Sequence, residues 1–342
     1  MARNPSAGGV TIEDVAARSG VSIATVSRVL SGSVPARPAT RERVLAAARE
    51  LNYRPSAVAR ALKLRSTRTF GLLITDIENP FFPQLVSAIE AEAVARGYGL
   101  VLCNTSDDPA RELASLDLLI ERRVDGIMVA SSRAMRRHAA LLRRIGVPVV
   151  LLNSGRVDGL PSIDTAQRRG ARLAADHLLE LGHRRIGHIT APRTNAAAAD
   201  RLAGVRDAVR AFGDDAELFV ADGDSHVSGG AAAAARLVTI ARCTGIVCYN
   251  DLTAIGALRG VRSSGLRVPE DVGIVGFDDI HLAAWIDPPL TTVRQPTGAM
   301  GRWAVERLFG LATGADSDEP ASVHLEPELV VRGSTGPVLV GA

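Results

Sequence analysis

The sequence predicts a small all-α helix-turn-helix head joined to an α/β body of two lobes, each lobe a parallel sheet flanked by helices. Three observations support this fold class. Residues 1–68 contain twelve Lys and Arg but only four Asp and Glu, whereas the whole chain has a net charge of +3. Apolar residues recur at helical spacing in the first fifty residues, and strand-like and helical stretches alternate from residue 68 onward. A basic helical head on a mildly acidic body is typical of a polyanion-binding module attached to a second domain.

The composition limits the class of protein. The 342 residues are 46% hydrophobic, which is enough for two or three packed domains. No run of about eighteen apolar residues is present, and the start of the chain lacks the apolar stretch of a secretory signal. Cys103, Cys243 and Cys248 are an odd number without C-x-x-C spacing, as expected for reduced core thiols. We therefore expect a soluble, cytoplasmic protein without membrane contact.

The head begins with a helix whose start is marked by a capping pattern, Thr11 followed by Asp14. A glycine turn ends this helix, and Ser22 can cap a second helix with Val26 and Val29 on its inward face. A third helix, from about residue 40 to residue 52, would support the pair. This arrangement is a helix-turn-helix, and its second helix is the one expected to enter the major groove of double-stranded operator DNA.

The outward face of the second helix carries candidate DNA contacts. Arg28 could pair bidentately with guanine, and Ile23 or Ala24 could pack on thymine methyl groups. The alternative is a basic disordered tail, but the helical periodicity argues against it. The predicted DNA contacts in and around this helix are Thr11, Ser22, Ile23, Ala24, Thr25, Ser27 and Arg28.

The next segment, residues 54–66, predicts a short conditional helix that Ser56 can cap. About nine residues are too few for a helix to be stable alone in water, so it would fold only with support from its symmetry mate and DNA. Leu62, an exposed leucine among arginines, resembles the apolar wedges that enter minor-groove steps. The alternative is an ordinary linker with one buried leucine. The candidate DNA contacts here are Ser56, Ala59, Arg60, Leu62 and Lys63.

The body contains eight candidate strands, each followed by a helical stretch. They are the segments 70–75, 98–104, 125–130, 148–153, 184–190, 217–222, 245–250 and 272–278. This alternation favours parallel sheets with helices on both faces, and so many units fit two lobes better than one sheet. Ligands of such sheets bind beyond the carboxyl ends of the strands. The candidate effector-binding residues at those ends are Asp76, Asn79, Phe81, Phe82, Asn153, Asn195, Arg201, Asn250 and Asp278.

The chemistry of these side chains indicates a sugar or another small polar ring. Carboxylates, amides and an arginine form paired hydrogen bonds to hydroxyl groups, and an aromatic face stacks on C–H groups. Taken singly, each residue has a structural alternative: Asp76 or Asp278 could cap the following helix, and the two phenylalanines could be core. Their joint occurrence at strand ends favours a binding site.

Three segments in this order resemble the lactose-repressor/galactose-repressor family of bacterial transcription regulators. They are TIEDVAARSGVSIATVSRVLSG (11–32), LNYRPSAVARALK (51–63) and GLLITDIENPFF (71–82), and the resemblance extends to about residue 332. It implies a recognition helix at 22–30, a hinge helix at 56–64 with Leu62 as its intercalating leucine, and a periplasmic-binding-protein-like body. It also implies that Arg201 in ADRLAGV and Asp278 in VGFDDI bind the effector.

One position departs from the family pattern. After the sequence GD many members carry an aromatic residue that stacks on the ligand, whereas this chain has Ser225. The departure makes a purine ring a less suitable effector than a sugar.

The resemblance also implies the domain boundaries. Residues 1–66 would be the DNA-binding domain, and residues 67–342 the effector-binding and dimerisation domain. The first lobe would comprise about 67–163 and 293–321, and the second about 164–292 and 322–333. Three crossings, near Ile163, Val293 and Ser322, would then form a hinge.

The sequence argues against an enzyme. No phosphate-binding loop, dinucleotide-binding glycine pattern or nucleophile elbow is present, and His183 and His188 have no third metal ligand nearby. We therefore expect no catalysis, cofactor or metal, but a homodimeric repressor controlled by a small polar effector, most simply a sugar. The alternatives are a regulator that responds to a nucleobase or another metabolite, and a stand-alone sugar-binding protein, which would need an export signal and no basic head.

Overall fold

The computed structural model describes residues 10–31, 36–53, 66–132, 135–192, 196–315 and 321–338. The chain divides into two compact units, Met1–Thr67 and Arg68–Ala342. The described part of the first unit is helical, and the second unit contains two sheets flanked by helices, which confirms the predicted fold class. The predicted hinge helix at 56–64 lies outside the described residues.

The first unit contains the helices α1 (Ile12–Ser19), α2 (Ile23–Ser31) and α3 (Pro38–Glu50). The predicted capping box begins α1: Thr11 Oγ1 accepts the amide of Asp14 at 3.3 Å, and the Asp14 carboxylate accepts the amide of Thr11 at 2.8 Å. Gly20 ends α1 with a φ of 65°, a conformation that glycine adopts without steric cost. The three helices meet at the fully buried residues Val15, Val26 and Val44.

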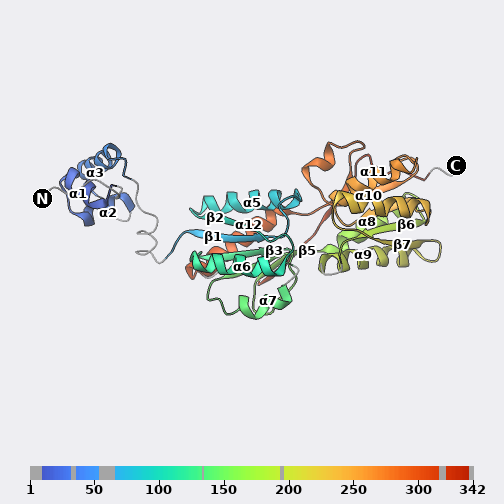
Figure 1. Ribbon diagram of the computed structural model, residues 1–342, viewed down its shortest axis with the longest axis horizontal. Coiled ribbons are helices and arrows are strands. Elements are labelled where there is room, and N and C mark those ends of the chain that lie inside the picture. Colours follow the sequence, from blue (N-terminus) through green and yellow to red (C-terminus); the bar gives the residue numbers. More distant parts are fainter. Residues whose placement is uncertain are drawn as a thin grey trace. The chain divides into compact units, whose positions relative to one another are not determined.

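The first lobe of the body is a six-stranded parallel sheet in the order β11-β5-β4-β3-β1-β2 (Figure 1). Its strands are β1 (Thr69–Ile74), β2 (Gly99–Asn104), β3 (Gly126–Ala130), β4 (Val149–Leu152), β5 (Ser162–Thr165) and β11 (Ser322–Leu325). Its helices are α5 (Phe81–Ala95), α6 (Pro109–Glu121), α7 (Met135–Leu142) and α12 (Thr297–Thr313). Adjacent residues of β1 point to opposite faces. Leu72 therefore packs with residues of α5 and α12, and Leu73 packs with residues of α6.

The second lobe is a six-stranded sheet in the order β12-β10-β9-β8-β6-β7, in which only β12 is antiparallel to its neighbour among the described pairs. Its strands are β6 (Arg185–Thr190), β7 (Glu217–Asp222), β8 (Gly245–Cys248), β9 (Gly273–Asp278), β10 (Thr291–Arg294) and β12 (Glu328–Val330). Its helices are α8 (Gln167–Glu180), α9 (Ala196–Phe212), α10 (Val227–Thr239), α11 (Asp251–Ser263) and the 3-10 helix η1 (His281–Ala284). Residues of α8 and α9 pack together in one cluster of the core, and those of α10 and α11 in another. The lobe therefore has helices on both faces, as the sequence predicts.

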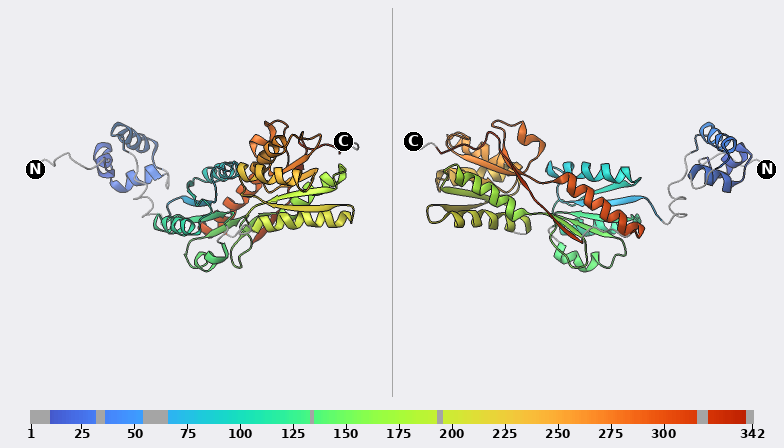
Figure 2. Two further views of the ribbon diagram at one scale, coloured as in Figure 1. Left: turned by 45° about the vertical axis from the view of Figure 1, so that its right-hand side comes forward. Right: turned by 180° about the vertical axis from the view of Figure 1, so that it is seen from behind.

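Three connections join the lobes, where the chain passes from one sheet to the other (Figures 1 and 2). Each lies a few residues later than the sequence predicts. The first is predicted near Ile163, but β5 belongs to the first sheet through Thr165. The second is predicted near Val293, but β10 pairs with β9 in the second sheet through Arg294. The third is predicted near Ser322, but that residue begins β11, which pairs with β5 in the first lobe. The connecting segments themselves supply strands at one edge of each sheet, so the chain leaves a lobe only after such a strand has ended.

The three cysteines are unbonded and buried in the body. Burial raises the pKa of the Cys243 thiol to about 12, so this thiol stays protonated and unreactive near neutral pH. Within the described ranges, no helix is long and apolar enough to cross a membrane.

Candidate functional site

A cleft in the body brings strand ends of both lobes together. It has a volume of about 600 Å³, part of which is open to solvent. Eight of the nine predicted effector-binding residues line it, namely Asp76, Asn79, Phe81, Phe82, Asn153, Arg201, Asn250 and Asp278. The ninth, Asn195, lies outside the described residues.

The first lobe contributes a polar turn and two aromatic rings to the cleft. Asp76 Oδ1 accepts the amide of Glu78 at 2.9 Å, and Asn79 Oδ1 accepts the amide of Phe81 at 3.1 Å. Both polar side chains therefore shape the loop that leads into α5. Phe81 and Phe82 lie edge to face with ring centroids 5.2 Å apart, and they pack in the core as well as lining the cleft. The sequence leaves open whether these phenylalanines belong to the core or to the cleft, and in the structure they belong to both.

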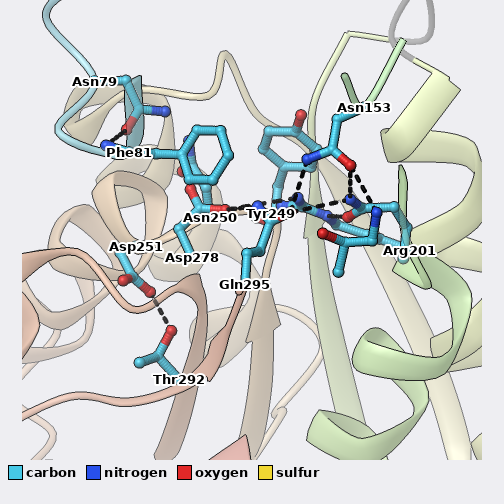
Figure 3. A network of polar contacts seen from close by, with 12 residues as sticks. Asn79, Phe81, Asn153, Arg201, Tyr249, Asn250, Asp251, Asp278, Thr292 and Gln295 are labelled. Atoms are coloured by element: carbon cyan, nitrogen blue, oxygen red, sulfur yellow. Dashed lines mark hydrogen bonds and ion pairs between the residues drawn. The ribbon is translucent and has the colours of Figure 1, made fainter. Parts of the chain in front are cut away.

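Arg201 enters the cleft from α9 and is almost fully buried (Figure 3). Its Nε donates to Gln167 Oε1 at 2.8 Å, and its Nη1 donates to the carbonyl oxygen of Tyr249. Its Nη2 lies 3.6 Å from Asp278 Oδ1. The guanidinium carbon lies 3.6 Å from the centre of the Phe277 ring, which attracts the cation through its negative face. These contacts fix both the position and the orientation of the positive charge.

Asp278, the last residue of β9, carries the opposing negative charge. Gln295 Nε2 donates to its Oδ1 at 2.7 Å. Burial raises the pKa of the Asp278 carboxyl to about 6, while the charge of Arg201 and the bond from Gln295 act in the opposite direction. Arg201 and Asp278 therefore brace the second lobe through their mutual ion pair and also line the cleft.

Asp251 has a structural role beside the candidate Asn250. It is fully buried, and its carboxylate accepts the amide of Ile280 at 2.8 Å and the hydroxyl of Thr292. Burial raises the pKa of this carboxyl well above its ordinary value. The bond from Ile280 holds the loop that directly follows Asp278, and the bond from Thr292 ties α11 to β10. Asp251 therefore shapes the site without lining the cleft.

Asn250 and Ser225 form the wall of the cleft near α10 and α11. Asn250 caps α11 by accepting the amide of Thr253 at 2.8 Å, and its Nδ2 donates to the carbonyl oxygen of Ser225 at 3.1 Å. Ser225 has a φ of 72°, and its Oγ is buried without a hydrogen-bond partner among the residues that the structure describes. Buried hydroxyls normally have partners, so this one is suited to a polar group of a ligand.

An amide network that the sequence pattern does not reveal lies between the lobes. Asn153 Nδ2 donates to Gln295 Oε1 at 2.9 Å, and Gln167 Nε2 donates to the same oxygen at 3.2 Å. Gln167 follows the short strand β5, and Gln295 follows the short strand β10. Because the sequence does not predict these two strands, it does not identify the glutamines as residues at strand ends. The other cleft residues absent from the predicted set are Thr75, Asp107, Ser131, Ala197, Ser225, His226 and Tyr249.

In the first unit, α2 presents the predicted DNA contacts. Ile23 is 46% exposed, and Ala24 and Arg28 are also exposed on this helix. Arg28 Nε donates to the carbonyl oxygen of Ala24 at 3.3 Å, and Ser22 Oγ accepts the amide of Thr25 at 3.3 Å. Ser27 is half-buried, whereas Thr11 lies in the cap of α1. The remaining candidates, Ser56, Ala59, Arg60, Leu62 and Lys63, lie outside the described residues.

Potential metal ligands do not gather in the part of the chain that the structure describes. Across those ranges, no group of three or more His, Cys, Asp or Glu side chains could hold a metal ion.

Comparisons with known proteins match both parts of the chain. Residues 11–56 match the lacI family of bacterial regulatory proteins, and residues 175–335 match a periplasmic binding protein-like domain. The HTH-type transcriptional repressor PurR of Haemophilus influenzae (strain PittEE) is 36% identical over 338 residues, which cover 96% of this chain and 99% of the relative. PurR of Aliivibrio fischeri (strain MJ11) is 37% identical over 337 residues, with 95% and 98% covered.

Solved structures share the fold over almost the whole chain. The Lac repressor dimer bound to operator and the anti-inducer ONPF has a TM-score of 0.86 at 30% identity, with 96% of this chain and all of that chain covered. The complex of the transcriptional regulator CelR with cellobiose has a TM-score of 0.71 at 35% identity, with 95% and 99% covered.

Proposed function

The chain belongs to the lacI family of bacterial regulatory proteins and is a DNA-binding transcriptional repressor rather than an enzyme, and from this premise we propose that a small polar effector bound in the cleft controls its repression. The observation that supports this proposal is the buried pair of Arg201 and Asp278 at the cleft, beside Asn250. A guanidinium, a carboxylate and an amide together supply the donors and acceptors that orient a polar ligand. Operator affinity would change with the effector if the ligand favoured one closure of the lobes.

A sugar is the effector class that the lining of the cleft favours. Arg201 and Asp278 can bind neighbouring hydroxyl groups, and Ser225 offers a hydroxyl rather than an aromatic face. Similar regulators have been solved with cellobiose and with ribose. A nucleobase is the second candidate, because relatives carry the name PurR and because Phe81 and Tyr249 also line the cleft.

Calorimetric titration of the full chain tests both classes. The panel contains ribose, cellobiose, adenine and guanine, each with the wild type and with the Asp278→Asn variant. We expect heat from a sugar that the variant loses, because a carboxylate accepts from hydroxyl groups more strongly than an amide does. Binding of a purine base without any sugar would overturn the sugar assignment. Unchanged affinity in the variant would show that the effector lies elsewhere.

The same proposal assigns DNA recognition to α2. Its exposed residues Ile23, Ala24 and Arg28 are of the types that read base edges in the major groove. Leu62, in the predicted hinge helix, is the proposed wedge in the minor groove. Replacing Leu62 by serine should weaken operator binding and leave nonspecific binding largely intact, because phosphate contacts supply the latter. Equal losses of affinity for operator and for random DNA in a mobility-shift assay would contradict the assignment of Leu62 as a minor-groove wedge.

We also propose a homodimer, as in the Lac repressor structure. The second lobe carries an exposed apolar patch at η1, where Trp285 is 79% and Leu282 50% exposed, beside a groove lined by Ile255 and Leu258. A large exposed aromatic next to apolar surface is typical of an interface. Trp285→Ser should therefore shift the protein toward monomers in analytical ultracentrifugation. The matched control is Ile240→Ser, since Ile240 is equally exposed on the same lobe but outside this patch. Equal behaviour of the two variants would refute this interface.

A further inference from the structure

Two buried glutamines stand at the connections between the lobes. Gln167 is the first residue of α8, just after the first connection, and Gln295 lies between β10 and α12 on the second. They are 8% and 3% exposed. The chain has only one other glutamine, Gln84 on α5, so the two connections hold most of this residue type.

The hydrogen bonds of these glutamines close a ring of four side chains. Arg201 Nε donates to Gln167 Oε1 at 2.8 Å, and Gln167 Nε2 donates to Gln295 Oε1 at 3.2 Å. Gln295 Nε2 then donates to Asp278 Oδ1 at 2.7 Å. The ion pair of Asp278 with Arg201, at 3.6 Å, completes the ring. Because arginine only donates and an ionised carboxylate only accepts, each glutamine amide has a single orientation.

Asn153 connects this ring to the first lobe. It follows β4 directly, and its Oδ1 accepts the backbone amide of Thr165 at 2.8 Å, which fixes its orientation. Its Nδ2 donates to Gln295 Oε1 at 2.9 Å (Figure 3). Asn153 does not hydrogen-bond Asp278. An effect of one on the other passes through Gln295, or through Gln167, whose Nε2 also donates to Asn153 Oδ1 at 3.4 Å, and Arg201.

We propose that Gln295 and Gln167 are positioning residues that hold the Arg201–Asp278 pair in one geometry and tie it to the first lobe through Asn153. This inference rests on the proposed role of the pair in effector binding. If the first lobe moves relative to the second, Gln295 cannot keep its bonds to both Asn153 and Asp278, because its amide is short and its orientation fixed. A change at the pair is therefore coupled to lobe closure, and the coupling is reciprocal.

The titration of Asp278 gives a readout that a purely structural brace would not move. The charged groups around it are Arg201 from α9, Asp251 from α11 and the neighbouring Asp279. The bond from Gln295 lowers the pKa of Asp278 against the larger effect of burial. Loss of this donor should raise the pKa further. A carboxyl with a raised folded-state pKa stabilises the protein at low pH, and this stability is lost as the pH rises to that pKa. The midpoint of this loss on the pH axis therefore moves upward when a bond that lowers the pKa of Asp278 is removed.

The test measures the melting temperature of the full chain between about pH 4 and pH 9, without any added ligand. Asp278→Asn removes the titrating carboxyl and so identifies its transition. Gln295→Met keeps the length of the side chain but loses its bonds. It should raise the folded-state pKa of Asp278 by at least about half a unit, a threefold change in proton affinity. The midpoint of the stability loss then moves upward by about half as much, because the unfolded-state pKa sets the other end of the loss. Gln167→Met should move it in the same direction. Gln84→Met, the matched control, should leave it in place.

A double variant tests the connection to the first lobe. Asn153→Ala should move the midpoint upward although Asn153 does not bond Asp278. The shift of the combination with Gln295→Met should be smaller than the sum of the two single shifts, because the bond to Gln295 is one of the two side-chain routes from Asn153 to the ring.

Three outcomes would overturn the proposal. If Gln295→Met lowers the melting temperature at every pH but leaves the midpoint of the stability loss in place, Gln295 has only a structural role. If the midpoint shifts of Asn153→Ala and Gln295→Met add fully in the double variant, Asn153 does not act on Asp278 through Gln295. If Gln295→Met does not fold, Gln295→Glu replaces it; this variant keeps the shape and faces Asp278 with a second carboxylate, and an unmoved midpoint there would also refute the proposal. Since no effector is added, a failed effector screen would leave these results unaffected.

Discussion

Replacing Arg201 by methionine should strongly destabilise the body near neutral pH. Methionine occupies similar apolar space but leaves the buried carboxylate of Asp278 without a counter-charge. Unit charges 3.6 Å apart interact by about 5 kcal/mol at an effective dielectric constant of about 20. Measured costs of removing one partner from a buried pair are about 3–5 kcal/mol. The Gln167 and Tyr249 oxygens also lose their donor, at about 1–3 kcal/mol for each acceptor left unpaired. We therefore expect a loss of at least about 3–5 kcal/mol in unfolding free energy.

The loss should depend on pH in a defined direction. Burial raises the pKa of Asp278 to about 6 in the wild type, and the nearby Arg201 keeps it from rising further. Without Arg201 the pKa lies higher. As the pH rises above about 6, the wild type has already lost the stability linked to this proton, while the variant continues to lose about 1.4 kcal/mol per pH unit up to its own pKa. The cost of Arg201→Met is therefore larger at alkaline than at acidic pH.

Urea unfolding of the wild type and variant on both sides of the pKa measures this difference. The double variant Arg201→Met/Asp278→Asn has no lone buried carboxylate and should recover much of the loss at alkaline pH. The matched control is Arg168→Met, because Arg168 is 62% exposed and its ion pair with the half-buried Asp207 should contribute about 1 kcal/mol or less. An equal cost of Arg201→Met on both sides of the pKa, without recovery in the double variant, would refute the argument that Arg201 compensates Asp278.

Three further predictions follow from the two units and their packing. Deleting residues 1–66 should leave a folded body without operator affinity, since the body is a separate compact unit; operator binding by the truncated chain in a mobility-shift assay would contradict this. Arg28→Ala should weaken operator binding by about 1–3 kcal/mol and relax the preference at one base position, as measured by selection from a randomised site, whereas a uniform loss on all sequences would indicate a phosphate contact. Gly204→Ala should destabilise the second lobe by about 1–3 kcal/mol, because the new Cβ would lie 2.0 Å from the carbonyl oxygen of Arg168 on α8. The control in thermal unfolding is Gly298→Ala, whose Cβ would have no described neighbour within 4 Å; equal melting temperatures would refute the close contact.

The sequence by itself determined the features that depend on neighbouring residues. The capping box of Thr11 and Asp14 joins residues three apart, so its signal is complete within one turn of chain. All eight predicted strands of the body exist, because each is a short apolar run bounded by turns and followed by a helix. Residues such as Asn153 and Asp278 can be grouped from the sequence alone, since the carboxyl ends of parallel strands meet at one edge of a sheet.

Only the tertiary structure decided the features whose partners are remote in the chain. Strands β5, β10, β11 and β12 are three or four residues long and gain their strand character from pairing, as between Ser322 and Ser162. The positions of the connections between the lobes follow from these pairings, so no local pattern marks them. The same holds for the ring through Gln167 and Gln295: a glutamine on a connecting segment reads as a surface residue until folding buries it and leaves its amide to be satisfied by other buried polar groups. The sequence could therefore indicate which side chains reach the cleft, while the fold determined which of them bond to one another.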